Sequence, residues 1–116
     1  MRHKNKGVIL DRQKAPREAM LSNLASSVLI YEKVKTTEAK AKAVKSIVER
    51  MITMARKGTL TSRRALIAAL LQKLAVRKAM DVLGKRYETR PGGYTRIVRL
   101  DRRDGDGAQM VLIELV

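Results

Sequence analysis

Residues 94–116 read YTRIVRLDRRDGDGAQMVLIELV, and this stretch decides the fold class. Residues 94–100 and 110–116 are rich in β-branched and apolar side chains, which favour strands. Residues 104–107 (DGDG) lie between them and are turn formers. The pattern predicts an antiparallel β-hairpin after a chain that otherwise shows helical periodicity, so we expect an α+β fold.

The first half of the chain predicts a helix, a strand and a second helix. Pro16 suits a first helical position, because its missing N–H is not needed there, and apolar residues recur at helical spacing beyond it. Residues 31–35 alternate loosely and predict a strand. Thr36 and Thr37 then predict a turn and the N-cap of the next helix, and Gly58 stands where a left-handed C-cap would end that helix.

A third helical region separates the second helix from the hairpin. Thr61 or Ser62 is a suitable N-cap for it, and an apolar series continues without glycine or proline until Gly84. One helix would account for this stretch, and so would two helices that meet at a bend near Gln72 and Lys73. We therefore expect two or three helices between the strand and the hairpin.

Charge indicates the class of partner. The 116 residues include 26 Lys and Arg against 11 Asp and Glu, a net charge of +15. A polyanion relieves the self-repulsion and releases its own counterions, so nucleic acid is the first expectation and an anionic membrane surface the second. No apolar run approaches the roughly 20 residues of a spanning helix, and no secretory signal is recognised, so we expect a cytoplasmic protein. The absence of Cys excludes disulfides and thiolate metal sites.

Residues 1–15 form a basic segment with little apolar periodicity, and we expect an N-terminal arm before a single domain at residues 16–116. A disordered, solvated tail is the plain interpretation. The density of cations beside one acid, Asp11, favours an arm that RNA orders. The side chains expected to contact RNA are Arg2, His3, Lys4, Lys6, Arg12 and Lys14.

The segment RPGGYTR at residues 90–96 is the strongest candidate site, with the Arg63–Arg64 pair as a second basic corner. Glycines let a phosphate approach main-chain amides, and arginines donate two parallel hydrogen bonds to it. A tyrosine can stack on a base and a threonine can offer its hydroxyl. The residues concerned are Arg90, Gly92, Gly93, Tyr94, Thr95 and Arg96. The competing interpretation is a Pro-Gly-Gly turn that leads into a strand, with Tyr94 in the core.

Catalysis has no candidate in this sequence. His3 is the one histidine, it lacks a nearby pair of carboxylates, and no GxGxxG or GxxxxGK[ST] motif occurs. We therefore predict no catalytic residue, metal ligand, cofactor or small-molecule substrate. Three tyrosines are the only aromatic residues, too few for a sheet that reads single-stranded bases, so recognition by shape and phosphate is expected.

Several short motifs, taken in order, resemble a known family. They are MRH at 1–3, REAMLSN at 17–23, KTT at 35–37, KAK at 40–42, RR at 63–64, GGYTR at 92–96, GDGA at 105–108 and the closing IELV. Together they are similar to the bacterial-type large-subunit ribosomal protein family seventeen. The motifs span the chain.

The resemblance implies an α+β fold whose helix-linked strand and hairpin form a small three-stranded mixed sheet. It also implies a non-enzymatic constituent of the large subunit, bound to 23S ribosomal RNA beside other ribosomal proteins near where the nascent chain emerges. Matching motif positions carry further RNA contacts over to Arg17, Asn23, Lys35, Lys40 and Lys42. One departure is that Lys14, Ala15 and Pro16 stand where family members often have Ser-Ser-His.

Three rival functions remain. A DNA-architectural protein would have the same excess of positive charge, and a preference for folded ribosomal RNA over duplex DNA separates the two. An RNA-modifying enzyme would need a catalytic group that the sequence does not offer. A peripheral membrane protein would need a broad apolar helix face flanked by aromatic residues.

Overall fold

The computed structural model describes Leu10 and residues 12–116, and its architecture is α+β as predicted. The elements in chain order are α1 (Lys14–Tyr31), β1 (Lys33–Thr37), α2 (Glu38–Lys57), α3 (Leu60–Leu70), α4 (Lys73–Lys78), a π-helical turn η1 (Ala79–Leu83), α5 (Gly84–Arg86), β2 (Thr95–Arg102) and β3 (Gln109–Leu115). None of the helices in this described part is long and apolar enough to cross a membrane.

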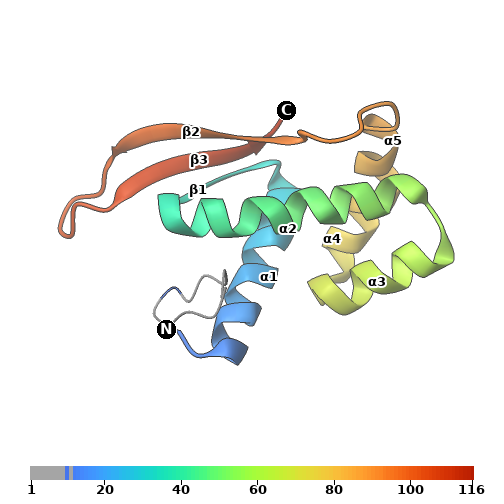
Figure 1. The fold of residues 1–116 in the computed structure, drawn as a ribbon, viewed down its shortest axis with the longest axis horizontal. Helices are drawn as coiled ribbons and strands as arrows, with labels where there is room; N and C mark the ends of the chain where they lie inside the picture. The colour runs from blue at the N-terminus through green and yellow to red at the C-terminus, as the bar shows by residue number, and fades with distance from the viewer. Residues whose placement is uncertain (1–9, 11) are drawn as a thin grey trace, which may run out of the picture.

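Helix α2 is the centre of the fold. Figure 1 shows it running beneath the sheet, with α1, α3 and α4 on its other side. Its N-cap is Thr37 and its C-cap is Gly58 in the left-handed conformation (φ 64°), as the sequence predicts. The buried stripe of α2 consists of Ala41, Val44, Val48, Met51, Ile52 and Ala55. Because both sides of the helix are covered, α2 sets the distance between the hairpin and the remaining helices.

The three strands form a wholly antiparallel sheet in the order β1-β3-β2. The expectation of a mixed sheet is wrong, because β3 lies between β1 and β2 and runs opposite to both. β1 and β2 share a direction but are not neighbours. The inward residues Val111 and Ile113 of β3 are fully buried, whereas the other face of the sheet carries residues such as Lys33 and Arg96.

Some element boundaries differ from the sequence prediction. α1 begins at Lys14, so that Pro16 is its third residue, a position whose N–H also lacks an intrahelical partner. Thr36 and Thr37 belong to β1 and do not form a turn, because β3 supplies the ladder they pair with. Thr59, not Thr61 or Ser62, caps α3, and its side chain accepts a hydrogen bond from the Ser62 amide at 3.1 Å.

The third helical region consists of more than one helix. Leu71 adopts the left-handed conformation (φ 61°), which ends α3, and α4 starts at Lys73. The bend lies at the position left open by the sequence. Ser22 and Ser26 of α1 donate hydrogen bonds to the carbonyls of Ala69 and Leu70, which ties α1 to the end of α3.

Helical structure continues through Gly84 to Arg86 because Gly84 packs directly against α2. A Cβ at this position would lie 2.7 Å from the carbonyl oxygen of Ala55, closer than side-chain carbons approach backbone oxygens. Only a glycine lets the two helix backbones come this near. This contact fixes the start of the segment that leads to the predicted RNA site.

Gly84→Ala is expected to lower the free energy of unfolding by about 1–3 kcal/mol, because the clash with Ala55 outweighs the better helix propensity of alanine. Urea denaturation of the isolated chain measures this. Gly92→Ala is the matched control, since nothing lies within 4 Å of a Cβ there. Equal stability of the two variants would contradict the close packing of Gly84.

Candidate nucleic-acid interface

Tyr94 anchors the RPGGYTR segment to the protein core. Its side chain is fully buried, and Arg56 of α2 donates a hydrogen bond to its hydroxyl at 3.2 Å. Thr53 lies 3.2 Å from the same hydroxyl and itself donates to the Glu49 carbonyl, so Tyr94 is left to donate to Thr53. The prediction that Tyr94 stacks on a base is therefore corrected, because burial between α2 and the sheet leaves its ring no accessible face.

Tyr87 forms the second half of this anchor. The two tyrosine rings meet with their centroids 5.1 Å apart, and the Tyr87 hydroxyl donates to the Val116 carbonyl at 2.7 Å. The guanidinium groups of Arg86 and Arg90 lie 5.9 and 5.8 Å from the Tyr87 ring centroid. Cation–π contacts of this kind hold a guanidinium near a surface without neutralising it.

The glycines of the segment lie beside these arginines. A Cβ placed on Gly92 or Gly93 would meet nothing within 4 Å, and Gly93 has φ +66°, which favours glycine. Arg90 donates to the Gly93 carbonyl at 3.4 Å. The backbone here is thus open to an approaching group, with one exposed arginine held next to it.

The last two residues of the segment differ from the prediction. Thr95 is only 6% exposed and its hydroxyl is buried without a hydrogen-bond partner in the described structure, so it is not available at the surface. Burial follows from the alternation of β2, which directs Thr95 inward and Arg96 outward. Arg96 is exposed and pairs with Glu114 of β3 at 2.5 Å.

A basic corner is formed where α2 ends and α3 begins. Arg63 and Arg64 are exposed in the first turns of α3. Arg63 lines a cleft together with Arg56 of α2 and Lys85 of α5. Arg56 also donates to the Glu88 carbonyl at 3.0 Å, which ties the corner to the chain just before Arg90. We call this group the corner cluster: Arg56, Lys57, Arg63, Arg64, Lys85 and Arg90.

Sequence reasoning identified Arg63, Arg64 and Arg90 but missed Arg56 and Lys85. No sequence motif marks either residue. Only the packing of α5 on α2 through Gly84 places Lys85 next to Arg63. No member of the cluster forms an ion pair within the described residues, although Asp81 and Glu88 also line the cleft.

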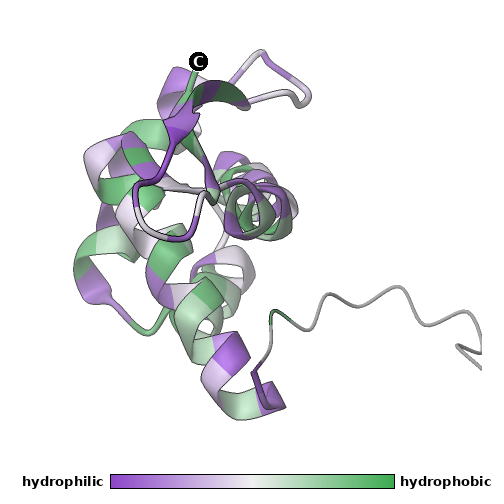
Figure 2. Ribbon diagram, turned by 90° about the vertical axis from the view of Figure 1, so that its left-hand side faces the viewer, coloured by the Kyte–Doolittle hydropathy of each residue, from purple (hydrophilic) through white to green (hydrophobic). Residues whose placement is uncertain are grey.

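The other predicted contacts are dispersed. Arg12, Lys14 and Arg17 lie at the start of α1, where Figure 2 shows hydrophilic residues. Asn23 is exposed and accepts a hydrogen bond from Gln72. Lys40 and Lys42 lie in the first turns of α2, and Lys42 pairs with Glu38 at 2.8 Å. The predicted contacts outside the described residues are Arg2, His3, Lys4 and Lys6.

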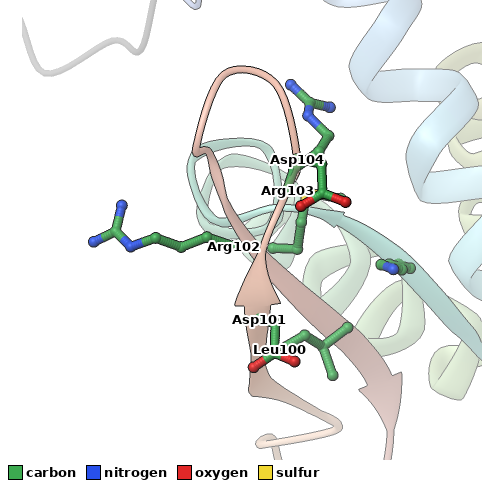
Figure 3. A pocket seen from close by; sticks show the side chains of 7 residues that line it. Leu100, Asp101, Arg102, Arg103 and Asp104 are labelled. Atoms are coloured by element: carbon green, nitrogen blue, oxygen red, sulfur yellow. The ribbon is translucent and has the colours of Figure 1, made fainter.

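Lys35 lies at the far end of the molecule, in a pocket at the base of the β2–β3 loop. Figure 3 shows Arg102 extending away from the sheet there, and Asp101 and Asp104 also line the pocket. Arg103 pairs with Asp106 and keeps the pKa of that carboxyl well below its usual range, with the Ala108 amide as a second cause. Acidic residues therefore line both this pocket and the corner cleft, but at the hairpin end Arg103 is neutralised by an ion pair, whereas no cation of the corner cluster is paired within the described residues.

Glu32 joins α1 to the segment that precedes the interface. It follows α1 in the left-handed conformation (φ 68°), and its carbonyl accepts from the Leu115 amide at 2.8 Å. Its carboxylate binds Arg86, and Lys78 donates to it at 2.9 Å. Hydrogen bonds from Arg86 and then Lys78 lower the pKa of Glu32 from 4.5 to about 2.

Glu32→Gln is expected to lower stability near pH 7, with the difference from the parent chain shrinking as pH falls from about 4.5 to about 2. The ionised Glu32 carboxylate stabilises the folded state at pH values above its unfolded-state pKa, because its pKa is lower in the folded state. Protonation of Glu32 as pH falls removes this stabilisation. Urea denaturation at several pH values measures the difference. Glu18→Gln, at an exposed position of α1, is the control. A difference that does not change with pH would contradict the ionic role.

Among the described residues, no group of three or more His, Cys, Asp or Glu side chains is placed to bind a metal ion. What the interface offers is a set of guanidinium and ammonium groups on rigid helices, next to open glycine backbone. These groups bind anions through charge-assisted hydrogen bonds.

Comparison with known proteins identifies the family of the chain. The large ribosomal subunit protein bL17 of Solibacter usitatus is 52% identical over 116 residues, which is all of this chain and 77% of that protein. The bL17 proteins of Carboxydothermus hydrogenoformans (50% identity, 92% of this chain and 96% of that protein) and Dehalococcoides mccartyi (45%, 100% and 99%) are similarly close. A family model described as ribosomal protein L17 matches residues 20–116. The chain therefore belongs to the ribosomal protein L17 family.

Proposed function

We propose that this protein is a structural constituent of the large ribosomal subunit that binds folded 23S ribosomal RNA through its phosphates and its shape. The observation that carries the proposal is the corner cluster, in which Arg56, Arg63 and Lys85 from three helices line one cleft. Lys57 and Arg64 adjoin them in sequence, and Arg90 lies two residues after Glu88, whose carbonyl Arg56 binds. None of the six forms an ion pair in the described structure. The location in the large subunit is proposed because relatives in this family are named as large-subunit proteins.

The corner cluster suits the backbone of a folded RNA better than its bases. Arg63 and Arg64 project from a helix and Arg90 lies against the Tyr87 ring, so the points from which these side chains extend have a fixed spacing. A rigid set of donors matches phosphates only where the RNA fold presents them at the same spacing. Tyr94 contributes by holding Gly92 and Gly93 in place, and it does not touch RNA itself.

The remaining predicted residues extend this surface. We assign phosphate contacts to Arg12, Lys14 and Arg17 at the start of α1 and to Lys40 at the start of α2. Arg96 and Lys42 contribute less, because each already has a carboxylate partner. The basic segment before α1, with Arg2, His3, Lys4 and Lys6, is proposed as an additional RNA-binding arm, and residues 16–116 as one RNA-binding domain.

In this proposal the protein acts in the cytoplasm, within the ribosome, and contacts neighbouring ribosomal proteins. It needs neither a cofactor nor a small-molecule substrate, and it has no catalytic step. Its contribution to translation is mechanical: a core that does not deform keeps bound RNA segments at a set separation. The longest dimension of the described structure is 43 Å, enough to touch more than one RNA helix.

Competition binding tests the proposal. Labelled 23S ribosomal RNA is bound to the full chain and displaced with unlabelled ribosomal RNA or with duplex DNA of equal phosphate concentration. We expect ribosomal RNA to compete at least tenfold better. Equal competition by DNA would favour a DNA-architectural protein and would overturn the proposal.

A paired variant locates the interface. Arg63→Glu together with Arg64→Glu is expected to weaken binding to ribosomal RNA about 30-fold or more, because two phosphate contacts become repulsive. The matched control is Arg102→Glu with Arg103→Glu, also adjacent exposed arginines, which lie at the hairpin end among Asp101, Asp104 and Asp106. A larger loss in the control pair than in the Arg63–Arg64 pair would move the interface to the hairpin.

A further inference from the structure

The outer face of α3 and α4 exposes large aliphatic side chains that the proposed function does not use. Ile67, Leu71 and Leu74 are 52%, 77% and 60% exposed. Ile67 lies in the last turn of α3, Leu71 follows that helix as its C-cap, and Leu74 lies in the first turn of α4, so the three residues lie where the two helices meet. Ile67 also lines a shallow pocket with Val76. Val76 itself is buried, and we call the exposed residues Ile67, Leu71 and Leu74 the aliphatic face.

Cations border the aliphatic face. Arg63, Lys73 and Arg77 line the same pocket, and none of them forms an ion pair within the described residues. Residues 59–80 contain no Asp or Glu. On the side of Ile67 the face is thus bordered by cations, whereas Leu71 lines a second pocket with Glu18 and Arg50. An apolar centre with a charged rim is the arrangement that marks a docking surface on a soluble protein.

Leu71 provides an independent observation. It occupies a left-handed backbone conformation (φ 61°) that normally favours glycine, and it is the most exposed large apolar residue of the described chain. The backbone here is strained, and most of the side chain is exposed, so packing within the described chain offsets little of that strain. Such a residue is explained if a bound partner covers it.

Two occupants fit poorly. Ribosomal RNA would bind the rim through phosphates but would leave branched aliphatic side chains unburied, because bases stack on planar groups. A second copy of this chain would bring another cationic rim and a net charge of +15 against the first. A partner that covers both parts of this surface has carboxylates to pair with the cations of the rim and apolar side chains to cover the aliphatic residues.

We infer that the aliphatic face docks a segment of another protein that carries aliphatic side chains flanked by Asp or Glu. The apolar side chains of this partner cover Leu71 and Leu74, and its carboxylates pair with Lys73 and Arg77. Arg63 belongs both to this rim and to the corner cluster, so the test of the inference changes only Lys73 and Arg77, which lie outside the corner cluster.

Photo-crosslinking in cells tests the inference. The full chain is produced with p-benzoylphenylalanine in place of Leu74, an exposed position, cells are irradiated, and crosslinked peptides are identified by mass spectrometry. We expect one dominant protein partner, crosslinked within a few residues of Asp or Glu. The same probe combined with Lys73→Glu and Arg77→Glu is expected to reduce the yield at least fivefold, and Lys73→Arg with Arg77→Lys to preserve it.

The probe at Val98, 41% exposed on the outer face of the sheet, is the positional control and should not give the same crosslink. Crosslinks to RNA, crosslinks to a second copy, absence of a dominant product, or a yield indifferent to charge reversal would each overturn the inference. Sedimentation of the uncrosslinked chain with large subunits is measured in the same lysate. Absence from the subunits would overturn the proposed function, whereas the crosslink decides the docking partner separately.

Discussion

Binding of this protein to 23S ribosomal RNA is expected to weaken about a thousandfold or more between roughly 50 and 200 mM salt. Such a steep dependence follows if roughly 6–10 phosphates are neutralised, because each contact releases a condensed counterion. The entropy gained by this release becomes smaller as the salt concentration rises. The corner cluster supplies six cations, and the start of α1 adds Arg12, Lys14 and Arg17. Titrations at a series of salt concentrations measure the slope of log affinity against log salt.

The Arg63→Glu, Arg64→Glu variant provides the internal check on this slope. Removal of two phosphate contacts should lower the slope by about two as well as the affinity. A shallow slope in the parent chain would mean that hydrogen bonds to bases or apolar contacts dominate, and it would contradict phosphate recognition. An unchanged slope in the variant would place the ionic contacts outside the corner.

Tyr94→Ala is expected to lower the free energy of unfolding by about 3–5 kcal/mol, or to prevent folding. The ring is fully buried against Tyr87, and its loss leaves a cavity between α2 and the sheet. It also removes the hydroxyl that Arg56 and Thr53 share, so that the Arg56 guanidinium loses a partner. Thermal and urea denaturation of the isolated chain measure the change.

Two further variants make this result interpretable. Tyr94→Phe keeps the ring and should cost only about 1 kcal/mol, the net value of the hydrogen bonds lost. Tyr31→Ala removes a tyrosine that is 71% exposed, and it should leave stability nearly unchanged. If Tyr94→Ala were as stable as Tyr31→Ala yet bound RNA far more weakly, Tyr94 would be a direct RNA contact and its burial in the core would be disproved.

The expected RNA binding by the corner cluster and the expected role of Tyr94 in stability are linked through Arg56. This residue holds Tyr94 and the Glu88 carbonyl at once, and it also lines the cleft with Arg63 and Lys85. The packing that stabilises the core therefore also sets the spacing of the cations that we propose to meet RNA. Tyr94→Phe tests this coupling, because it should lower RNA affinity modestly while the net charge stays the same.

The sequence by itself determined those features that depend on neighbours along the chain. Turn formers between two β-branched runs predicted the hairpin, and a left-handed Gly58 after an apolar stripe predicted the end of α2. The excess of cations predicted a polyanionic partner, because net charge does not depend on how the chain folds. The resemblance of ordered motifs predicted the family, which the comparisons confirm.

Tertiary structure alone decided whether Tyr94 faces RNA or the core, because the same Gly-Gly-Tyr pattern serves both uses and only the position of α2 distinguishes them. It also decided that Arg56 and Lys85 join Arg63, through a glycine contact between elements far apart in sequence. Local periodicity and capping act over a few residues, whereas burial and the meeting of charges depend on which distant segments pack together. The elements could therefore be read from the chain, and the grouping of their side chains could not.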